Sequence, residues 1–174
     1  MEFKNINVLK FEPGLLWDAM LNHLPEIGAK IDDLESIVEK ERKVIDAYTI
    51  RVVNVWRAKP NLPAVVAKHI KPEMLAWTDT GVWNEKKKIV QWEIDSHYFG
   101  KQMDCAGTTL FEPAMGGKGT RIIFSGNLQW KGDKISLGLG IFDSTILKVA
   151  ESVMVQVIPA NFRKITALLG DYIN

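Results

Sequence analysis

One long apolar helix at the C-terminal end constrains the fold of this chain more than any other feature of its sequence. Apolar residues recur every three or four positions, at Ile146, Val149 and Val153 among others, which is the spacing of one helix face. This spacing predicts a helix over Ser144–Tyr172, with a kink at Pro159, because proline lacks the N–H and crowds the preceding turn. So long a helix needs a broad apolar surface to cover it.

Alternating apolar and polar residues supply that surface as a series of strands. The strands are predicted at residues 2–10, 35–44, 48–57, 75–83, 89–98, 103–112 and 120–130. Helices are predicted at 12–21, in a second short segment reaching about residue 34, and at 62–70. The expected fold class is α+β: a curved antiparallel sheet of six to seven strands wrapped around the C-terminal helix, with two short helices after the first strand. A single domain over residues 1–174 is expected.

Composition excludes several classes of function. Apolar residues make up 47% of the 174 residues and the formal net charge is +1, so no field attracts nucleic acid. The single cysteine, Cys105, excludes an internal disulfide and fits a reducing compartment. The N-terminus lacks the apolar core of a signal peptide, and charges and glycines interrupt the stretch Ile135–Ile158, which is therefore no membrane span. We expect a cytoplasmic protein.

Four sequence features carry a resemblance to a known family. They are Leu16-Trp17-Asp18-Ala19, the hairpin with Trp77, Trp83 and Trp92, the pair Gly107-Thr108-Thr109-Leu110-Phe111 and Gly119-Thr120-Arg121, and the closing helix. Together with the order of elements, they resemble the START-like or SRPBCC superfamily, whose helix-grip fold includes the major pollen allergens. The resemblance covers essentially the whole chain and implies an internal apolar cavity between the sheet and the C-terminal helix. It implies no catalytic motif.

Strand parity selects the residues that would line such a cavity. Side chains at every second strand position share a face. The apolar faces of the strands and the apolar face of the C-terminal helix together predict which residues line the cavity. The predicted ligand-binding residues are Trp56, Trp92, Phe111, Phe124, Trp130, Val149 and Val153, with Asn54 as a polar anchor. Plain core packing would also explain these large side chains, and Cys105 is expected to pack as a small buried hydrophobe.

Catalytic residues are harder to nominate. His97 ends a strand and could face the mouth of the cavity, while Asp79 shares strand parity with Trp77 and Trp83 and could point inward. A buried carboxylate needs a hydrogen-bond donor or a cation. Strand parity places the arginines of the strands on the outer face, so none of them is expected to pair with Asp79. The three histidines have no metal-ligand spacing, and we expect neither a metal nor a cofactor.

Three hypotheses for function remain open at this stage. The first is the binding or transport of a hydrophobic or amphipathic small molecule, possibly a lipid, with a transient membrane contact through Ile135–Phe142. The second is a cyclase, aromatase or hydrolase that uses the same cavity. The third is an interaction domain with a filled core. The absence of a visible catalytic constellation favours the first, and the oligomeric state stays open.

Overall fold

The computed structural model describes residues 1–59, 72–131 and 143–173, apart from the side chains of Pro72, Lys101, Trp130 and residues 143–157. The helix predicted at Leu62–Ile70 and the predicted membrane contact at Ile135–Phe142 lie outside the described residues.

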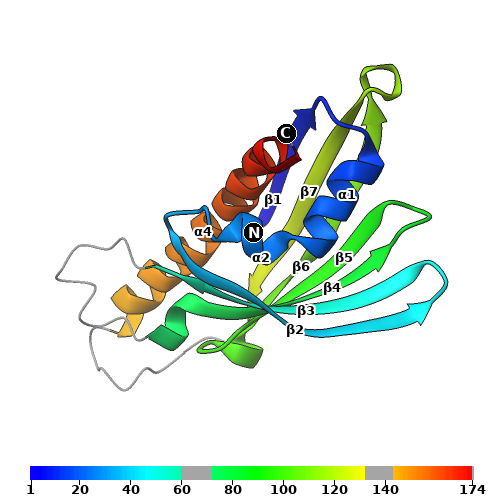
Figure 1. Ribbon diagram of the computed structural model, residues 1–174. Helices are drawn as coiled ribbons and strands as arrows, with labels where there is room; N and C mark the ends of the chain where they lie inside the picture. Colours follow the sequence, from blue (N-terminus) through cyan, green and yellow to red (C-terminus); the bar gives the residue numbers. More distant parts are fainter. Residues whose placement is uncertain (60–71, 132–142, 174) are drawn as a thin grey trace.

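One curved antiparallel sheet runs through the described residues (Figure 1). Its strands are β1 (Glu2–Leu9), β2 (Leu34–Asp46), β3 (Thr49–Ala58), β4 (Ala76–Asn84), β5 (Ile89–Ser96), β6 (Met103–Ala114) and β7 (Gly119–Trp130). Their spatial order is β1-β7-β6-β5-β4-β3-β2, so β1 and β2 form the two edges. Each strand from β2 to β6 pairs with the next one in sequence, whereas β1 crosses over to pair with β7. The strand predictions and the α+β fold class are confirmed.

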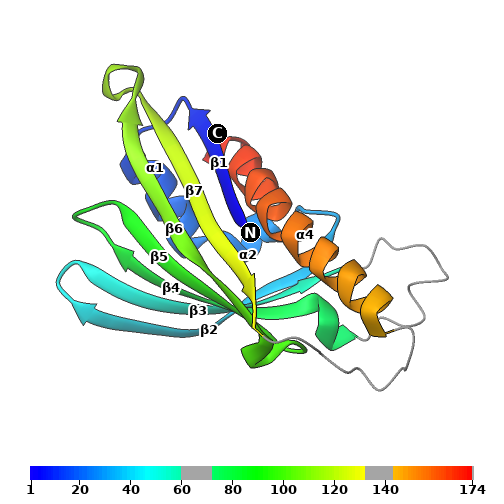
Figure 2. The ribbon, with the colours of Figure 1, turned by 180° about the vertical axis from the view of Figure 1, so that it is seen from behind.

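Three α-helices occupy one side of this sheet in the described chain (Figures 1 and 2). They are α1 (Pro13–Asn22), α2 (Leu24–Gly28) and α4 (Asp143–Ile173). Pro13 opens α1 at a position where a missing N–H costs nothing, and Leu16, Trp17 and Met20 bury one face of it. Short 3₁₀ turns lie at Pro72–Leu75, Gly100–Gln102 and Met115–Gly117. The helix α4 continues through Pro159 as one element.

The glycine-rich turn between β6 and β7 forms as expected. Met115, Gly116 and Gly117 have φ angles of 53°, 67° and 88°, in the left-handed region that glycine adopts without strain. This turn fixes the longest register in the sheet, from Met103 opposite Trp130 to Ala114 opposite Gly119.

Two glycines in the middle of this register let an aromatic ring lie flat on the sheet. Gly107 of β6 and Gly126 of β7 are directly paired. A Cβ built on either would come within 2.4 Å of the Trp92 indole, and one on Gly107 would also lie 2.1 Å from the carbonyl oxygen of Ser125. Trp92 therefore occupies the space where side chains of β6 and β7 would otherwise stand.

The edge strand β2 is anchored to the helical layer by one arginine. The Arg42 guanidinium donates to the Glu39 carboxylate at 2.7 and 2.9 Å, to the Leu21 carbonyl at 2.8 Å and to Asn22 Oδ1 at 2.9 Å. The Leu21 carbonyl lies in the last turn of α1, where backbone carbonyls lack helical partners, and Asn22 is the last residue of that helix. The contact thus ties β2 to α1 at a point where β2 is exposed.

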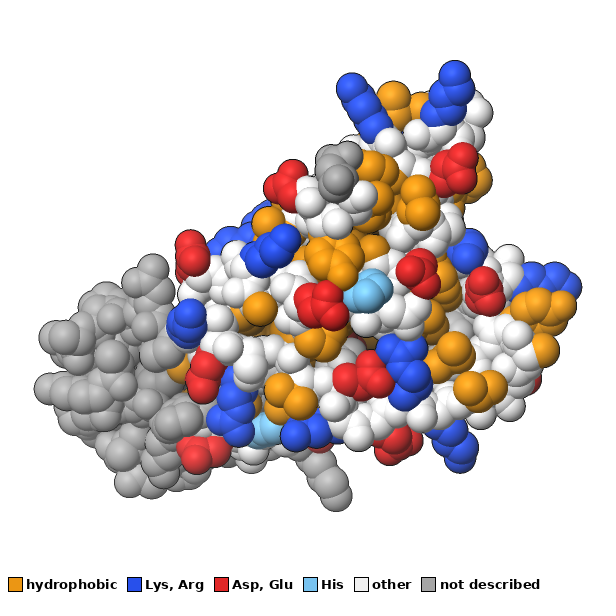
Figure 3. All heavy atoms as spheres, in the orientation of Figure 1, with side chains coloured by type: hydrophobic (Ala, Val, Ile, Leu, Met, Phe, Trp, Pro, Cys, Tyr) orange, Lys and Arg blue, Asp and Glu red, His pale blue; other side chains and the backbone are white. Residues whose placement is uncertain are grey.

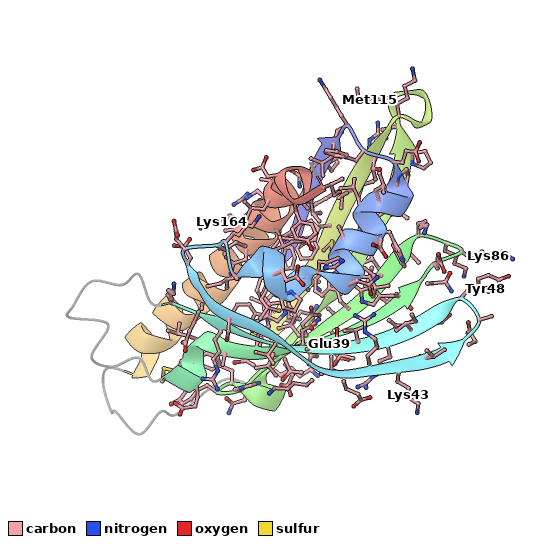
Figure 4. All side chains as sticks on the ribbon, in the orientation of Figure 1. Glu39, Lys43, Tyr48, Lys86, Met115 and Lys164 are labelled. Atoms are coloured by element: carbon pink, nitrogen blue, oxygen red, sulfur yellow. The ribbon has the colours of Figure 1, made fainter. Side chains whose placement is uncertain are left out.

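Charged side chains of both signs are interspersed over the face of the molecule that Figure 3 shows. At the tips of the β2–β3 and β4–β5 hairpins, Tyr48 and Lys86 project away from the body, as does Lys43 of β2 (Figure 4). The Lys86 ammonium lies 5.7 Å from the centre of the Tyr48 ring. Among the described residues, no helix is long and apolar enough to cross a membrane.

Candidate functional site

A cavity lies between the concave face of the sheet and the helices. Its volume is about 60 Å³. The sheet contributes Trp56, Trp77, Asp79, Trp83, Trp92 and Phe124 to its lining. The helices contribute Met20, Leu24, Ile158, Asn161, Phe162 and Ile165. The space between sheet and helix is therefore partly open.

Stacked aromatic rings form two of the walls. Phe162 of α4 stacks on Phe124 with ring centres 4.0 Å apart, and Phe124 stacks on Trp92 at 4.8 Å. Trp56 and Trp77, which are paired on the neighbouring strands β3 and β4, lie nearly parallel to each other, with ring centres 5.8 Å apart. Flat aromatic surfaces suit a flat apolar ligand, because offset stacking adds to the gain from burial.

A carboxyl group faces this apolar space. Asp79 is half-buried and borders the cavity. It lies in a row of paired residues across the sheet, with Asn54 on one side and Ile94 and Cys105 on the other. Desolvation raises the pKa of Asp79 from 3.8 to about 7, and an interaction with the Trp56 indole N–H opposes that rise only in part. Near neutral pH this group is therefore poised between acid and base.

Two hydrogen-bond donors in the cavity lining have no partner among the described residues: Trp56 Nε1 and Asn161 Nδ2. The interaction of Trp56 with Asp79 falls short of hydrogen-bond geometry. Trp56 is 8% exposed and Asn161 3%, so bulk water does not reach them freely. Trp92 differs, because its Nε1 donates to Thr109 Oγ1 at 3.2 Å. Buried donors are normally satisfied, and these two add to the few polar groups of a mostly apolar lining.

The thiol of Cys105 stays protonated in this environment. It is 1% exposed, and desolvation together with the Asp79 charge raises its pKa to about 12. The nucleophile is the thiolate rather than the thiol, so Cys105 packs as a small apolar side chain.

The structure brings some of the predicted ligand-binding residues together and separates others. Trp56, Trp92 and Phe124 line the cavity, and their contact with a ligand stays a prediction. Asn54 is buried beside Asp79 but does not border the open space. Phe111 is buried elsewhere in the core, edge-on to Trp17 at 5.4 Å. Strand parity placed it on the right face but could not say how far along the strand the cavity extends.

Three further predicted residues fall outside what the structure describes. The side chains of Trp130, Val149 and Val153 are not described. Their contribution to a binding site therefore stays a prediction.

His97 does not lie at the cavity. It is exposed, and its Nε2 lies 2.9 Å from Thr78 Oγ1, a side chain that alternates with the cavity-facing Trp77 and Asp79. The buried side chains of β5 alternate up to its last residue, Ser96, so strand parity places the following residue, His97, on the outer face. The expectation that His97 faces the cavity mouth is not met, and Asp79 is the acid–base candidate that the geometry retains.

The sequence analysis did not identify Asn161 of α4 as a residue of the site. Asn161 sits four residues after Val157 and four before Ile165, and it interrupts the apolar stripe of α4. The signal in the sequence is a single polar side chain, an amide, on a helix face that is otherwise apolar. No cluster of three or more potential metal ligands occurs within the described ranges.

Comparison with solved structures places this architecture among known proteins. An aromatase/cyclase from Streptomyces sp. R1128 shares 11% identity, with a TM-score of 0.67 over 98% of this chain and 92% of its own. A protein from Thermus thermophilus shares 15% identity, with a TM-score of 0.65 over 99% and 97%. Norcoclaurine synthase from Thalictrum flavum, in complex with dopamine and hydroxybenzaldehyde, shares 8% identity, with a TM-score of 0.61 over 99% and 86%.

These likenesses establish the helix-grip fold of this chain and leave its chemistry open. No protein-family model matches the sequence, and no curated protein matches it either. The resemblance expected from the sequence is confirmed at the level of the fold.

Proposed function

We propose that this protein binds a compact hydrophobic or amphipathic small molecule in the cavity between its sheet and α4. The observation that carries the proposal is the cavity itself, with stacked aromatic walls and two buried donors that lack partners among the described residues. Apolar clefts with a few convergent polar groups are the usual form of small-molecule sites. Norcoclaurine synthase, which shares the fold, holds the single-ring compounds dopamine and hydroxybenzaldehyde.

A lipid is the larger candidate ligand, and the size of the cavity argues against it. A volume of about 60 Å³ favours a single ring over an acyl chain of about sixteen carbons. Each methylene group of such a chain adds about 0.8 kcal/mol to the binding free energy only when it is buried. A cytoplasmic location belongs to the same proposal, and the lone thiol Cys105 supports it.

Native mass spectrometry of the freshly purified protein, followed by mass analysis of its organic extract, tests this proposal. We expect a co-purifying molecule, or saturable binding of single-ring aromatic probes. Val90→Phe fills the cavity and should abolish either observation, whereas Val82→Phe, on the other face of the sheet, should not. Equal ligand retention by both variants, or no binding of any probe, would contradict the proposal.

An enzyme of the cyclase, aromatase or hydrolase kind is the second candidate, and one observation favours it. Asp79 faces the cavity with a pKa of about 7, the range in which a general acid or base works best. The aromatase/cyclase from Streptomyces sp. R1128 has the same fold. Turnover of a bound ligand that Asp79→Asn abolishes, with binding retained, would establish this function; turnover that survives the substitution would exclude Asp79.

A further inference from the structure

Resting on this proposed function, we propose that the ligand is a neutral aromatic ring compound whose carbonyl oxygen accepts hydrogen bonds from Trp56 and Asn161. The donors come from opposite walls, the indole from β3 and the amide from α4, and both line the same cavity. Neither has a partner among the described residues. A ligand oxygen between them would satisfy both.

The unpaired groups are donors, and this fact selects the chemistry of the ligand. An indole N–H cannot accept a hydrogen bond, and the unpartnered atom of Asn161 is its amide nitrogen. A hydrocarbon would leave both donors desolvated and unpaired, which costs free energy. An ammonium group would add further donors. A carbonyl oxygen, with two lone pairs, complements both.

The walls select the body of the ligand. Trp56 and Trp77 are parallel within 18°, and Phe124 and Phe162 within 12°. The cavity holds about 60 Å³. Flat aromatic surfaces of this kind favour a planar ring over a long flexible chain.

Asp79 makes the binding of such a ligand depend on pH. Its carboxylate interacts with the same Trp56 N–H and would repel a carbonyl oxygen, whereas the protonated form leaves that N–H free. The groups that face it are uncharged: Cys105 from β6 keeps its proton because its pKa is about 12, and the cavity-lining residues of α1, α2 and α4 carry no charge. Because the pKa of Asp79 is about 7, a carbonyl ligand should bind more weakly at pH 8 than at pH 6.

Three probes of one shape separate the possibilities. Acetophenone carries a carbonyl oxygen, α-methylstyrene replaces that oxygen with a methylene group, and 1-phenylethylamine replaces it with an ammonium group. Titrations of the full chain, followed by NMR shifts of the tryptophan indole N–H groups, give the three affinities at pH 6 and pH 8. Trp56→Phe identifies the Trp56 signal.

We expect acetophenone to bind about tenfold more tightly than α-methylstyrene at pH 6, the effect of one well-made hydrogen bond. The Trp56 signal should move downfield with acetophenone alone. Asn161→Leu should shrink the ratio, and Asn7→Leu should preserve it, because Asn7 also has a buried amide nitrogen without a described partner but does not line the cavity. Circular dichroism verifies that each variant folds.

Each other outcome has a defined meaning. Equal binding of acetophenone and α-methylstyrene, or tightest binding of the amine, overturns this inference and leaves the proposed function standing. A tenfold preference that persists in both Asn161→Leu and Trp56→Phe also overturns it. Failure of all three probes to bind overturns the proposed function itself.

Discussion

Asp79 couples the stability of the folded protein to pH. Its pKa rises from 3.8 in the unfolded chain to about 7 in the fold, so between these values the folded state holds the proton more tightly. Stability from this group is therefore full below about pH 4 and is lost as pH rises to about 7. A shift of this size corresponds to at most about 4 kcal/mol.

Asp79→Asn should remove this dependence. We expect the free energy of unfolding of the natural protein, relative to that of the variant, to fall between pH 4 and pH 7 and to level off above pH 8. Urea denaturation at a series of pH values measures both proteins, and the difference cancels the titration of other carboxylates. Parallel curves for the two proteins would show that Asp79 is not desolvated.

The residues of the site differ in how far the sequence could reveal them. Parity alone identified Asp79, Trp56, Trp92 and Phe124 as inward-facing, because the period of a strand is two. It could not separate Phe111, which shares the face but not the cavity. The position of the cavity along each strand depends on where the helices cross the sheet, and no local pattern contains that information.

At the scale of elements, α4 contacts the sheet through Phe162, whose ring lies 4.0 Å from that of Phe124. Phe162→Ala should cost roughly 3–5 kcal/mol and should enlarge the cavity, so that a two-ring ketone such as 2-acetylnaphthalene binds. Phe111→Ala is the matched control, because it removes a similarly buried ring away from the cavity. It should lose similar stability without gaining the larger ligand.

Urea denaturation and ligand titration of both variants measure these two effects separately. A gain of two-ring binding in both variants would mean that general loosening, rather than the space left by Phe162, admits the ligand.

The helices and strands themselves were largely predictable from the sequence. The signals that define them depend only on nearby residues in the sequence. They are the hydrophobic period, Pro13 at the start of α1 and the glycines before β7. The predicted β2 stopped short of its actual end at Asp46, because its outer half is exposed and has no apolar face to reveal it. The edge position of β2 follows from the pairing of β3 with β4, which is a long-range property.

At the scale of the whole molecule, the sheet should be unevenly stable. The outer half of β2, from Glu39 to Asp46, is exposed and has a neighbour on one side only, whereas β6 is paired on both sides and largely buried on the concave face. Local opening is easiest where backbone hydrogen bonds are solvent-exposed.

Hydrogen exchange followed by mass spectrometry or NMR should therefore find the fastest-exchanging strand amides in the outer half of β2 and the slowest in β6 and β7. Arg42→Met, which removes the tie to α1, should accelerate exchange in β2 and leave β6 unchanged. Uniform protection across the sheet would contradict this gradient.

The paired glycines beneath Trp92 have a consequence for how such a cavity changes over evolution. Because a Cβ on Gly126 would meet the indole at 2.4 Å, one added methyl group there would displace the ring and reduce the space available to a ligand. A methyl group on Gly107 would in addition meet the Ser125 backbone at 2.1 Å and disturb the strand pairing. The capacity of the cavity is thus set partly by two positions that contribute no side chain to its wall. A lineage could exchange one ligand for a smaller or larger one by altering the floor beneath the aromatic lining, while every group that recognises the ligand stays the same.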